Sequence, residues 1–179
     1  MKLLKSLSLG LVTVLSLSLA VQADEVKVGD DAPNFELKGS DGKTYKLSDF
    51  KGKQAVVVSW FPKAFTGGCT AECKSLKEEG KLVKAFNVAY FTASCDTVDD
   101  NTKFAKSLEL DYPILSDPTR ETAMKYGVAA DAKANAKRWS FFIGKDGKIA
   151  HVEQKVNTKE HAKQVSDKLK ELGVEAAKK

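Results

Sequence analysis

The chain has 179 residues, with 29 Lys and Arg against 24 Asp and Glu, which gives a formal net charge of +5. This small excess is spread along the sequence. Its densest stretch, Lys133 to Arg138, has no aromatic residue to stack on bases, so we expect no nucleic-acid partner. The three cysteines allow at most one intramolecular disulfide, which argues against a scaffold held together by disulfides.

The N-terminus has the pattern of a secretory signal. Two lysines precede an apolar, leucine-rich run over residues 7–20, which closes on Val21-Gln22-Ala23. This pattern predicts a signal peptide over residues 1–23. The alternative is a transmembrane anchor, but the run is shorter than the roughly 20 apolar residues that a span needs. We therefore expect a single domain over residues 24–179, periplasmic or secreted, with no membrane contact after cleavage.

The first predicted elements are a hairpin, a central strand and a helix. Strand patterns flank the turn-forming tetrapeptide Ser40-Asp41-Gly42-Lys43 and predict a hairpin over residues 34–47. Residues 54–61 contain a nearly continuous β-branched block, which is typical of a strand buried on both faces. Apolar residues at helical spacing then predict a helix from Cys69 to Phe86, bent or divided at Gly80.

Alternating elements follow in the middle of the chain. The patterns predict, in order, a strand over residues 88–94, a helix over 98–108 and a short strand over 112–115. A further helix is expected with Asp117 as its cap, Pro118 in its first turn and Gly127 past its end.

The chain closes with a second hairpin and a last helix. The turn at Lys145-Asp146-Gly147-Lys148 joins strands predicted over 138–143 and 149–154. Asn157 is expected to cap an amphipathic helix that ends before Gly173. This order predicts an α/β, thioredoxin-like fold, a three-layer sandwich with a central mixed β-sheet and an N-terminal β-hairpin.

Cys69 lies where the central strand passes through a loop into a helix. A helix N-terminus favours negative charge, so it favours the reactive thiolate of a cysteine. The alternative is an inert buried cysteine. We expect an exposed, reactive one, because the glycine pair before it should leave the position open. The Thr66 hydroxyl is close enough to hydrogen-bond both the sulfur and a bound substrate, and Pro62 is placed to exclude water.

These residues carry a resemblance to a known family. The pattern Pro62-x-x-x-Thr66-x-x-Cys69 resembles the peroxiredoxin signature, the mark of the alkyl hydroperoxide reductase and thiol-specific antioxidant superfamily. The run from Trp60 to Ala64, leading to Gly68-Cys69-Thr70, resembles its Q-type branch, which includes the bacterioferritin comigratory proteins. Further segments resemble the family in order and spacing, from about Val28 to Glu153.

The resemblance implies a thiol-dependent peroxidase without cofactor or metal. It implies that Cys69 is the peroxidatic nucleophile, that Thr66 orients the peroxide, that Pro62 shields the pocket and that Arg138 stabilises the thiolate. Glu72 matches the family's helix glutamate, which helps to hold the arginine. A fixed guanidinium near sulfur also favours the thiolate on physical grounds and stabilises charge on the leaving oxygen. The alternative for Arg138 is a surface ion pair.

A second cysteine is needed to convert the resulting sulfenic acid into a disulfide. Cys73 lies one helical turn after Cys69, while Cys95 closes the strand predicted over 88–94. Cβ atoms four residues apart in a helix are about 5–6 Å apart, but a disulfide needs about 3.5–4.5 Å, so the helix must loosen. The commonest Q-type arrangement spaces the cysteines by five residues rather than four. We favour Cys73, with Cys95 as an alternative resolving residue or a core cysteine.

Two other functions are compatible with parts of the sequence. A thioredoxin-like thiol-disulfide oxidoreductase normally needs Cys-x-x-Cys, whereas this chain has Cys69-Thr-Ala-Glu-Cys73. A Cu(I)-binding thioredoxin-like chaperone would use the same two thiolates, but it would also need a histidine ligand. We interpret His151 and His161 as surface or hydrogen-bonded histidines rather than catalytic bases. The expected partners are a peroxide and a thioredoxin-like protein reductant, and the expected state is a monomer or weak homodimer.

Overall fold

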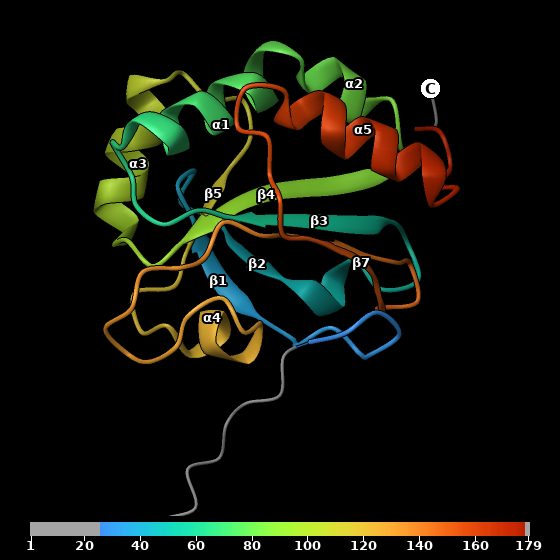
Figure 1. Ribbon diagram of the computed structural model, residues 1–179, viewed down its shortest axis with the longest axis horizontal. Helices are drawn as coiled ribbons and strands as arrows, with labels where there is room; N and C mark the ends of the chain where they lie inside the picture. Colours follow the sequence, from blue (N-terminus) through green and yellow to red (C-terminus); the bar gives the residue numbers. More distant parts are fainter. Residues whose placement is uncertain (1–25, 178–179) are drawn as a thin grey trace, which may run out of the picture.

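The computed structural model describes residues 26–177, so the predicted signal peptide and its cleavage site lie outside the described residues. A seven-stranded mixed sheet in the order β2-β1-β5-β4-β3-β6-β7 forms the centre of the fold (Figure 1). Its strands are β1 (Glu36–Gly39), β2 (Thr44–Lys46), β3 (Ala55–Trp60), β4 (Val88–Ser94), β5 (Ile114–Ser116), β6 (Ser140–Ile143) and β7 (Ile149–Glu153). The pairs β3–β4 and β4–β5 are parallel, and the other pairs are antiparallel.

All the predicted strands form, although β5 and β6 each begin two residues later than the sequence predicts. Every residue of β3 is buried, as expected of an apolar β-branched run that lies between the parallel strand β4 and the antiparallel strand β6. In the first hairpin, the Gly39 amide donates to the Lys43 carbonyl at 2.7 Å, and Gly42 has a φ of +84°, which a residue without a Cβ adopts at little cost. Both hairpins and the mixed sheet of the predicted fold are confirmed.

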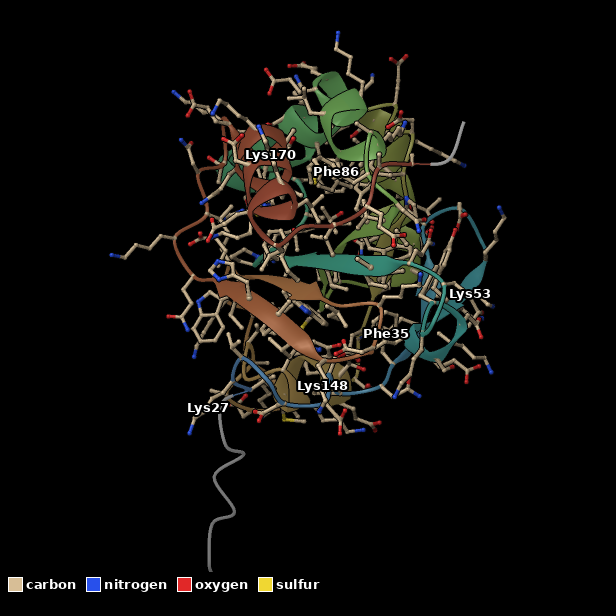
Figure 2. All side chains as sticks on the ribbon, turned by 90° about the vertical axis from the view of Figure 1, so that its right-hand side faces the viewer. Lys27, Phe35, Lys53, Phe86, Lys148 and Lys170 are labelled. Carbon is tan, nitrogen blue, oxygen red and sulfur yellow. The ribbon has the colours of Figure 1, made fainter. Side chains whose placement is uncertain are left out.

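Helices cover the two faces of the sheet unequally. The helices are α1 (Gly67–Glu78), α2 (Gly80–Lys84), α3 (Val98–Ser107), α4 (Glu121–Lys125) and α5 (His161–Glu171), with a short 3-10 turn, η1 (Leu47–Asp49). Figure 1 shows α1, α2, α3 and α5 on one side of the sheet and α4 on the other. In Figure 2, Phe35 and Phe86 mark these two sides, and each belongs to a different hydrophobic cluster.

The long helix predicted from Cys69 to Phe86 is divided at Gly80, as expected. A Cβ at Gly80 would lie 3.3 Å from the Tyr90 hydroxyl on β4, so a side chain here would press on the sheet. The break lets α2 turn and pack against α5. No helix within residues 26–177 has both the length and the apolar character needed to cross a bilayer.

Two predicted helix starts are wrong. The chain forms a turn at Asp117, whose carbonyl accepts from the Arg120 amide at 3.0 Å, and Arg120 takes a φ of +63°. Pro118 therefore lies in this turn, and α4 begins only at Glu121. The Asp117 carboxylate instead accepts from the Ala123 amide at 2.8 Å.

At the last helix, Asn157 also begins a turn, because its carbonyl accepts from the Glu160 amide at 3.2 Å. The helix α5 begins four residues later, at His161. Its second amide, that of Ala162, donates to the Ser75 hydroxyl of α1 at 3.1 Å. A side chain from another helix therefore satisfies an amide in the first turn of α5, whereas the Asn157 side chain accepts from the Lys159 amide at 3.3 Å within the turn that precedes the helix. The glycines expected past the helix ends, Gly127 and Gly173, have φ values of +69°.

Candidate active site

The loop between β3 and α1 is held against the sheet at several points. The Phe61 amide donates to the Ala93 carbonyl of β4 at 2.9 Å, and the Ala64 amide donates to the Asp96 carboxylate at 2.8 Å. Phe65 has a left-handed φ of +62° and an exposed ring that packs on Phe104. These contacts fix the direction in which the chain enters α1.

Cys69 is the third residue of α1, and its side chain has no exposed surface. The expectation of an exposed cysteine is therefore wrong. Gly67 and Gly68 belong to the helix and face outward, whereas Cys69 points inward and packs in a cluster with Phe61 and Phe104. Burial alone fits the inert reading of this cysteine, so its polar neighbours decide what it can do.

Arg138 supplies a cation to this buried sulfur. Its Nη2 donates to Cys69 Sγ at 3.2 Å. A Cβ at Gly68 would come within 3.2 Å of the same nitrogen, so the glycine leaves the guanidinium its room. The sequence predicts that Arg138 begins a strand, but β6 begins two residues later, at Ser140. A thiolate at Cys69 would therefore meet a fixed positive charge at a sulfur that is itself buried from solvent.

Glu72 holds the other side of the guanidinium. Arg138 Nη1 forms a hydrogen-bonded ion pair with Glu72 Oε2, and the glutamate side chain has no exposed surface. Burial raises the pKa of the Glu72 carboxyl to about 7, against the opposing charge and hydrogen bond of Arg138. The arginine is mostly buried between these two partners, so the reading of Arg138 as a surface ion pair is wrong.

Thr66 and Pro62 belong to the loop that precedes α1. Thr66 is the residue before α1, and its hydroxyl donates to the Lys63 carbonyl at 2.9 Å. The single hydroxyl proton is therefore not directed at Cys69 Sγ, contrary to the sequence prediction. Pro62 is partly buried and follows the fully buried Phe61, a position suited to screening the pocket from water.

Cys73 lies one turn further along α1 and is also fully buried. The Tyr112 hydroxyl donates to its backbone carbonyl at 3.0 Å. Burial, and next the charge of Glu72, raise the pKa of the Cys73 thiol to about 12. We call α1 in this intact form the closed helix. In the closed helix, Cys73 is therefore a thiol and not a nucleophile.

Cys95 belongs to the opposite side of the sheet. It packs in the cluster with Phe91 and Ala93, beneath α4, whereas Cys69 and Cys73 share a cluster under α3. Burial, and next the charge of Asp117, raise the pKa of the Cys95 thiol to about 11. The structure thus brings Cys69 and Cys73 together and separates Cys95 from both.

His161 is a member of the site that the sequence prediction missed. It is fully buried at the start of α5, with its Nδ1 3.3 Å from Glu72 Oε1 and its Nε2 3.0 Å from the Ser140 hydroxyl. The available signal was its spacing of four from Val165 and again from Leu169, which places it on the buried face of the helix. His151, in contrast, lies on β7 with its ring 5.5 Å from that of Phe142.

The arrangement combines a buried sulfur, a guanidinium that contacts it, a carboxylate that holds the guanidinium, and an imidazole beside that carboxylate. Between residues 26 and 177, no group of three or more His, Cys, Asp or Glu side chains is placed to hold a metal ion. Such a set can stabilise a thiolate and the negative charge that develops on an oxygen leaving from it.

Comparisons with known proteins bear on this chemistry. The family model described as AhpC/TSA family matches residues 28–152. The chain is 35% identical over 152 residues to peroxiredoxin Bcp of Escherichia coli strain K12, covering 82% of this chain and 97% of that protein. It is 29% identical over 153 residues to peroxiredoxin Bcp of Bacillus subtilis strain 168, covering 82% of this chain and 97% of the relative.

Solved structures agree on the fold. The structure of peroxidoxin BcpB from Mycobacterium tuberculosis superposes with a TM-score of 0.75 at 29% identity, covering 82% of this chain and 98% of that one. A PrxQ mutant from Xylella fastidiosa superposes with a TM-score of 0.76 at 23% identity, covering 83% and 98%. The second likeness supports the thioredoxin-like peroxiredoxin fold alone.

Proposed function

The chain belongs to the AhpC/TSA family, in its Bcp or Q-type peroxiredoxin branch, and is a thiol peroxidase acting on peroxides; from this premise we propose that Cys69 is the residue that attacks the peroxide. The observation that carries the proposal is the 3.2 Å contact between Arg138 Nη2 and Cys69 Sγ. Of the three cysteines, Cys69 is the one whose sulfur accepts a hydrogen bond from a guanidinium in the described part of the chain.

In the proposed first step, the Cys69 thiolate attacks one oxygen of hydrogen peroxide or an organic hydroperoxide. An S–O bond forms, the O–O bond breaks, and sulfur is oxidised to the sulfenic acid. The leaving hydroxide or alkoxide takes up a proton from water as it leaves the site. Arg138 stabilises both the thiolate and the charge on the leaving oxygen, because its guanidinium is held in place beside a fully buried sulfur.

The remaining site residues have supporting roles in this proposal. Glu72 fixes the guanidinium, and Pro62 screens the sulfur from water. Thr66 orients the peroxide through its hydroxyl oxygen, whose lone pairs remain available while its proton is donated to Lys63.

In the proposed second step, the Cys73 thiolate attacks the Cys69 sulfenic acid, forms the disulfide and releases water after protonation. The shared helix and shared hydrophobic cluster support Cys73 over Cys95. Because the pKa of the buried Cys73 thiol is about 12, α1 must open before this attack. A thioredoxin-like dithiol would then reduce the disulfide, and a monomer or weak homodimer suffices for the cycle.

Export is the remaining part of the proposal. The signal pattern over residues 1–23 precedes the family match, which begins at residue 28. N-terminal sequencing of the protein recovered from a periplasmic fraction should give Asp24 as the first residue. A mature protein that retains the lysine-rich start in the cytosol would contradict export.

The peroxidase proposal is tested by stopped-flow oxidation of the reduced protein with hydrogen peroxide. Wild type should react much faster than a free thiol, and Cys69→Ser should abolish the reaction. Cys73→Ser is the matched variant, since it removes the neighbouring thiol of the same helix. It should keep the rapid oxidation and stop at the sulfenic acid.

The outcomes separate the parts of the proposal. If wild type reacts no faster than a free thiol, the role of Cys69 fails. If Cys73→Ser still forms an intramolecular disulfide and Cys95→Ser does not, the resolving residue is Cys95. Stoichiometric Cu(I) retention that both Cys69→Ser and Cys73→Ser abolish would favour the metal-binding alternative.

A further inference from the structure

A chain of buried polar contacts extends from the reactive sulfur into the centre of the sheet. Arg138 links Cys69 Sγ to Glu72 Oε2, and Glu72 Oε1 faces His161 Nδ1 at 3.3 Å. Beyond the imidazole, Nε2 lies 3.0 Å from Ser140 Oγ and 3.5 Å from Ser59 Oγ. The two hydroxyls are themselves hydrogen-bonded at 2.8 Å.

The Glu72 carboxylate and the His161 imidazole each have one unsatisfied polar atom. Among residues 26–177, neither Glu72 Oε1 nor His161 Nδ1 makes a hydrogen bond, and the two atoms lie 3.3 Å apart. Both side chains are fully buried, so water does not replace a lost partner. A buried polar atom without a partner is costly, and a proton shared between this oxygen and this nitrogen would satisfy both atoms.

The position of that proton follows from the charges around it. Burial, and next the charge of Arg138, lower the pKa of the His161 imidazole to about 3, so the ring is neutral near pH 7. A neutral ring carries one proton, and the Glu72 carboxyl, whose pKa is about 7, carries a proton only part of the time near neutral pH. When Glu72 is ionised and paired with Arg138, the tautomer that satisfies both atoms has the proton on Nδ1, donated to Glu72 Oε1. Nε2 then accepts from the Ser59 hydroxyl at 3.5 Å, because the Ser140 hydroxyl donates its proton to Ser59.

We propose that His161 is a positioning residue for the peroxidase reaction: its Nδ1–H holds Glu72 ionised and oriented, and Glu72 in turn holds Arg138 against Cys69. The inference rests on the proposed role of Cys69. His161 does not touch the sulfur. It acts through two intervening side chains, and the hydroxyls of Ser140 and Ser59 fix its ring and its tautomer from the far side.

The charged and titratable groups around the pair come from few elements. Glu72 and the two cysteines belong to α1, Arg138 comes from the segment before β6, and Tyr112 precedes β5, near Cys73. The strands β3 and β6 present only neutral hydroxyls to the ring. Arg138 is thus the one cation that reaches Glu72 in the described part of the chain.

The two ring nitrogens allow a matched pair of substitutions. Asn places an amide nitrogen close to the position of Nδ1, so His161→Asn can keep the hydrogen bond to Glu72. Gln places its amide close to the position of Nε2, so His161→Gln can keep the contact with Ser140 and loses the one to Glu72. Both variants remove the aromatic ring from the same buried position, so both should lower the unfolding temperature.

The test is the rate of Cys69 oxidation by hydrogen peroxide in the Cys73→Ser background, measured across pH. We expect His161→Gln to slow oxidation about tenfold, because a hydrogen bond to a charged group is lost, and His161→Asn to stay within about threefold. The pH profile of His161→Gln should also shift, because Glu72 then takes up a proton at higher pH. Equal slowing by both variants, with unchanged pH profiles, would reduce His161 to a structural residue and overturn the proposal.

A double-mutant cycle tests the route through Glu72. In the Glu72→Gln background, His161→Gln should have little additional effect on oxidation, since the carboxylate that His161 is proposed to keep ionised is already absent. An undiminished effect there would overturn the proposed route. If the Cys73→Ser protein with native His161 reacts no faster than a free thiol, the proposed function fails instead, so the two failures are distinguishable.

Discussion

Cys69 and Cys73 are the same residue type on the same helix, one turn apart, and both are fully buried. The charged groups nearest to the two sulfurs have opposite signs. Cys69 receives a hydrogen bond from the Arg138 guanidinium, whereas the Cys73 thiol is near the carboxylate of Glu72 and far from solvent. Burial therefore does not distinguish the two cysteines. In the proposed reaction, the charge next to each buried sulfur decides which one attacks the peroxide.

In the proposed cycle, this difference divides the reaction between two states of α1. The proposed first oxidation uses the closed helix, because there Arg138 is held by Glu72 and contacts Cys69. The proposed disulfide formation requires the open helix, because a closed α1 separates the sulfurs and keeps Cys73 protonated. In this proposal, the ion pair that promotes the first step opposes the second.

The largest expected effect comes from removing the charge that distinguishes the two cysteines. Arg138→Gln should slow oxidation of Cys69 by about 10²–10³-fold, the usual cost of losing a fixed donor to developing negative charge. Stopped-flow oxidation with hydrogen peroxide measures this.

The matched control is Arg120→Gln. Arg120 is the other arginine of the chain, and it donates to the Ala134 and Pro118 carbonyls near α4. It should leave the oxidation rate within about twofold of wild type, as expected of a substitution remote from the reaction. Comparable slowing in the two variants would mean that the contact at Cys69 has no special role.

The second effect concerns the pH dependence of disulfide formation. If Cys73 attacks from an open helix, its rate should rise about tenfold per pH unit and level off near the ordinary thiol pKa of about 8.5. The sign follows because the thiolate is the nucleophile. The closed helix raises the pKa of this thiol to about 12, so attack from it would give a rate that keeps rising well above pH 9. Rapid-quench trapping of the disulfide after a pulse of peroxide separates the two profiles.

A smaller effect is expected from the tyrosine that secures the second turn of α1. Tyr112→Phe removes the hydrogen bond to the Cys73 carbonyl, so it should speed disulfide formation a few-fold and cost about 1 kcal/mol of stability. Tyr90→Phe is the matched control, because its ring packs 5.1 Å from that of Tyr112 and its hydroxyl has no hydrogen-bonding partner among residues 26–177. Slower disulfide formation in Tyr112→Phe would contradict the need for opening.

The sequence predicted the strands well and the helix starts poorly, for physical reasons. The apolar run of β3 and the break at Gly80 follow from local residue types. The starts of α4 and α5 depend instead on turns at Asp117 and Asn157. Asp and Asn are common both as helix N-caps and in turns, so the residue type does not tell the two apart.

The sequence predicted the site residues only where they belong to a recognisable motif. Cys69, Thr66 and Pro62 lie in one short pattern, and Arg138 and Glu72 were placed by resemblance to the family. His161 was missed, because its contacts with Glu72 and Ser140 join segments far apart in the chain. The burial of Cys69 was also missed, since it depends on Phe61 and Phe104 rather than on the neighbouring glycines.

Hydrogen exchange at the amides from Cys69 to Leu76 compares the closed and open states of α1 directly. The reduced protein should protect these amides, and the oxidised, disulfide-bonded protein should exchange them much faster, while the amides of β3 remain protected in both. Equally slow exchange along Cys69 to Leu76 in the reduced and oxidised proteins would contradict the division of the reaction between two states of the helix.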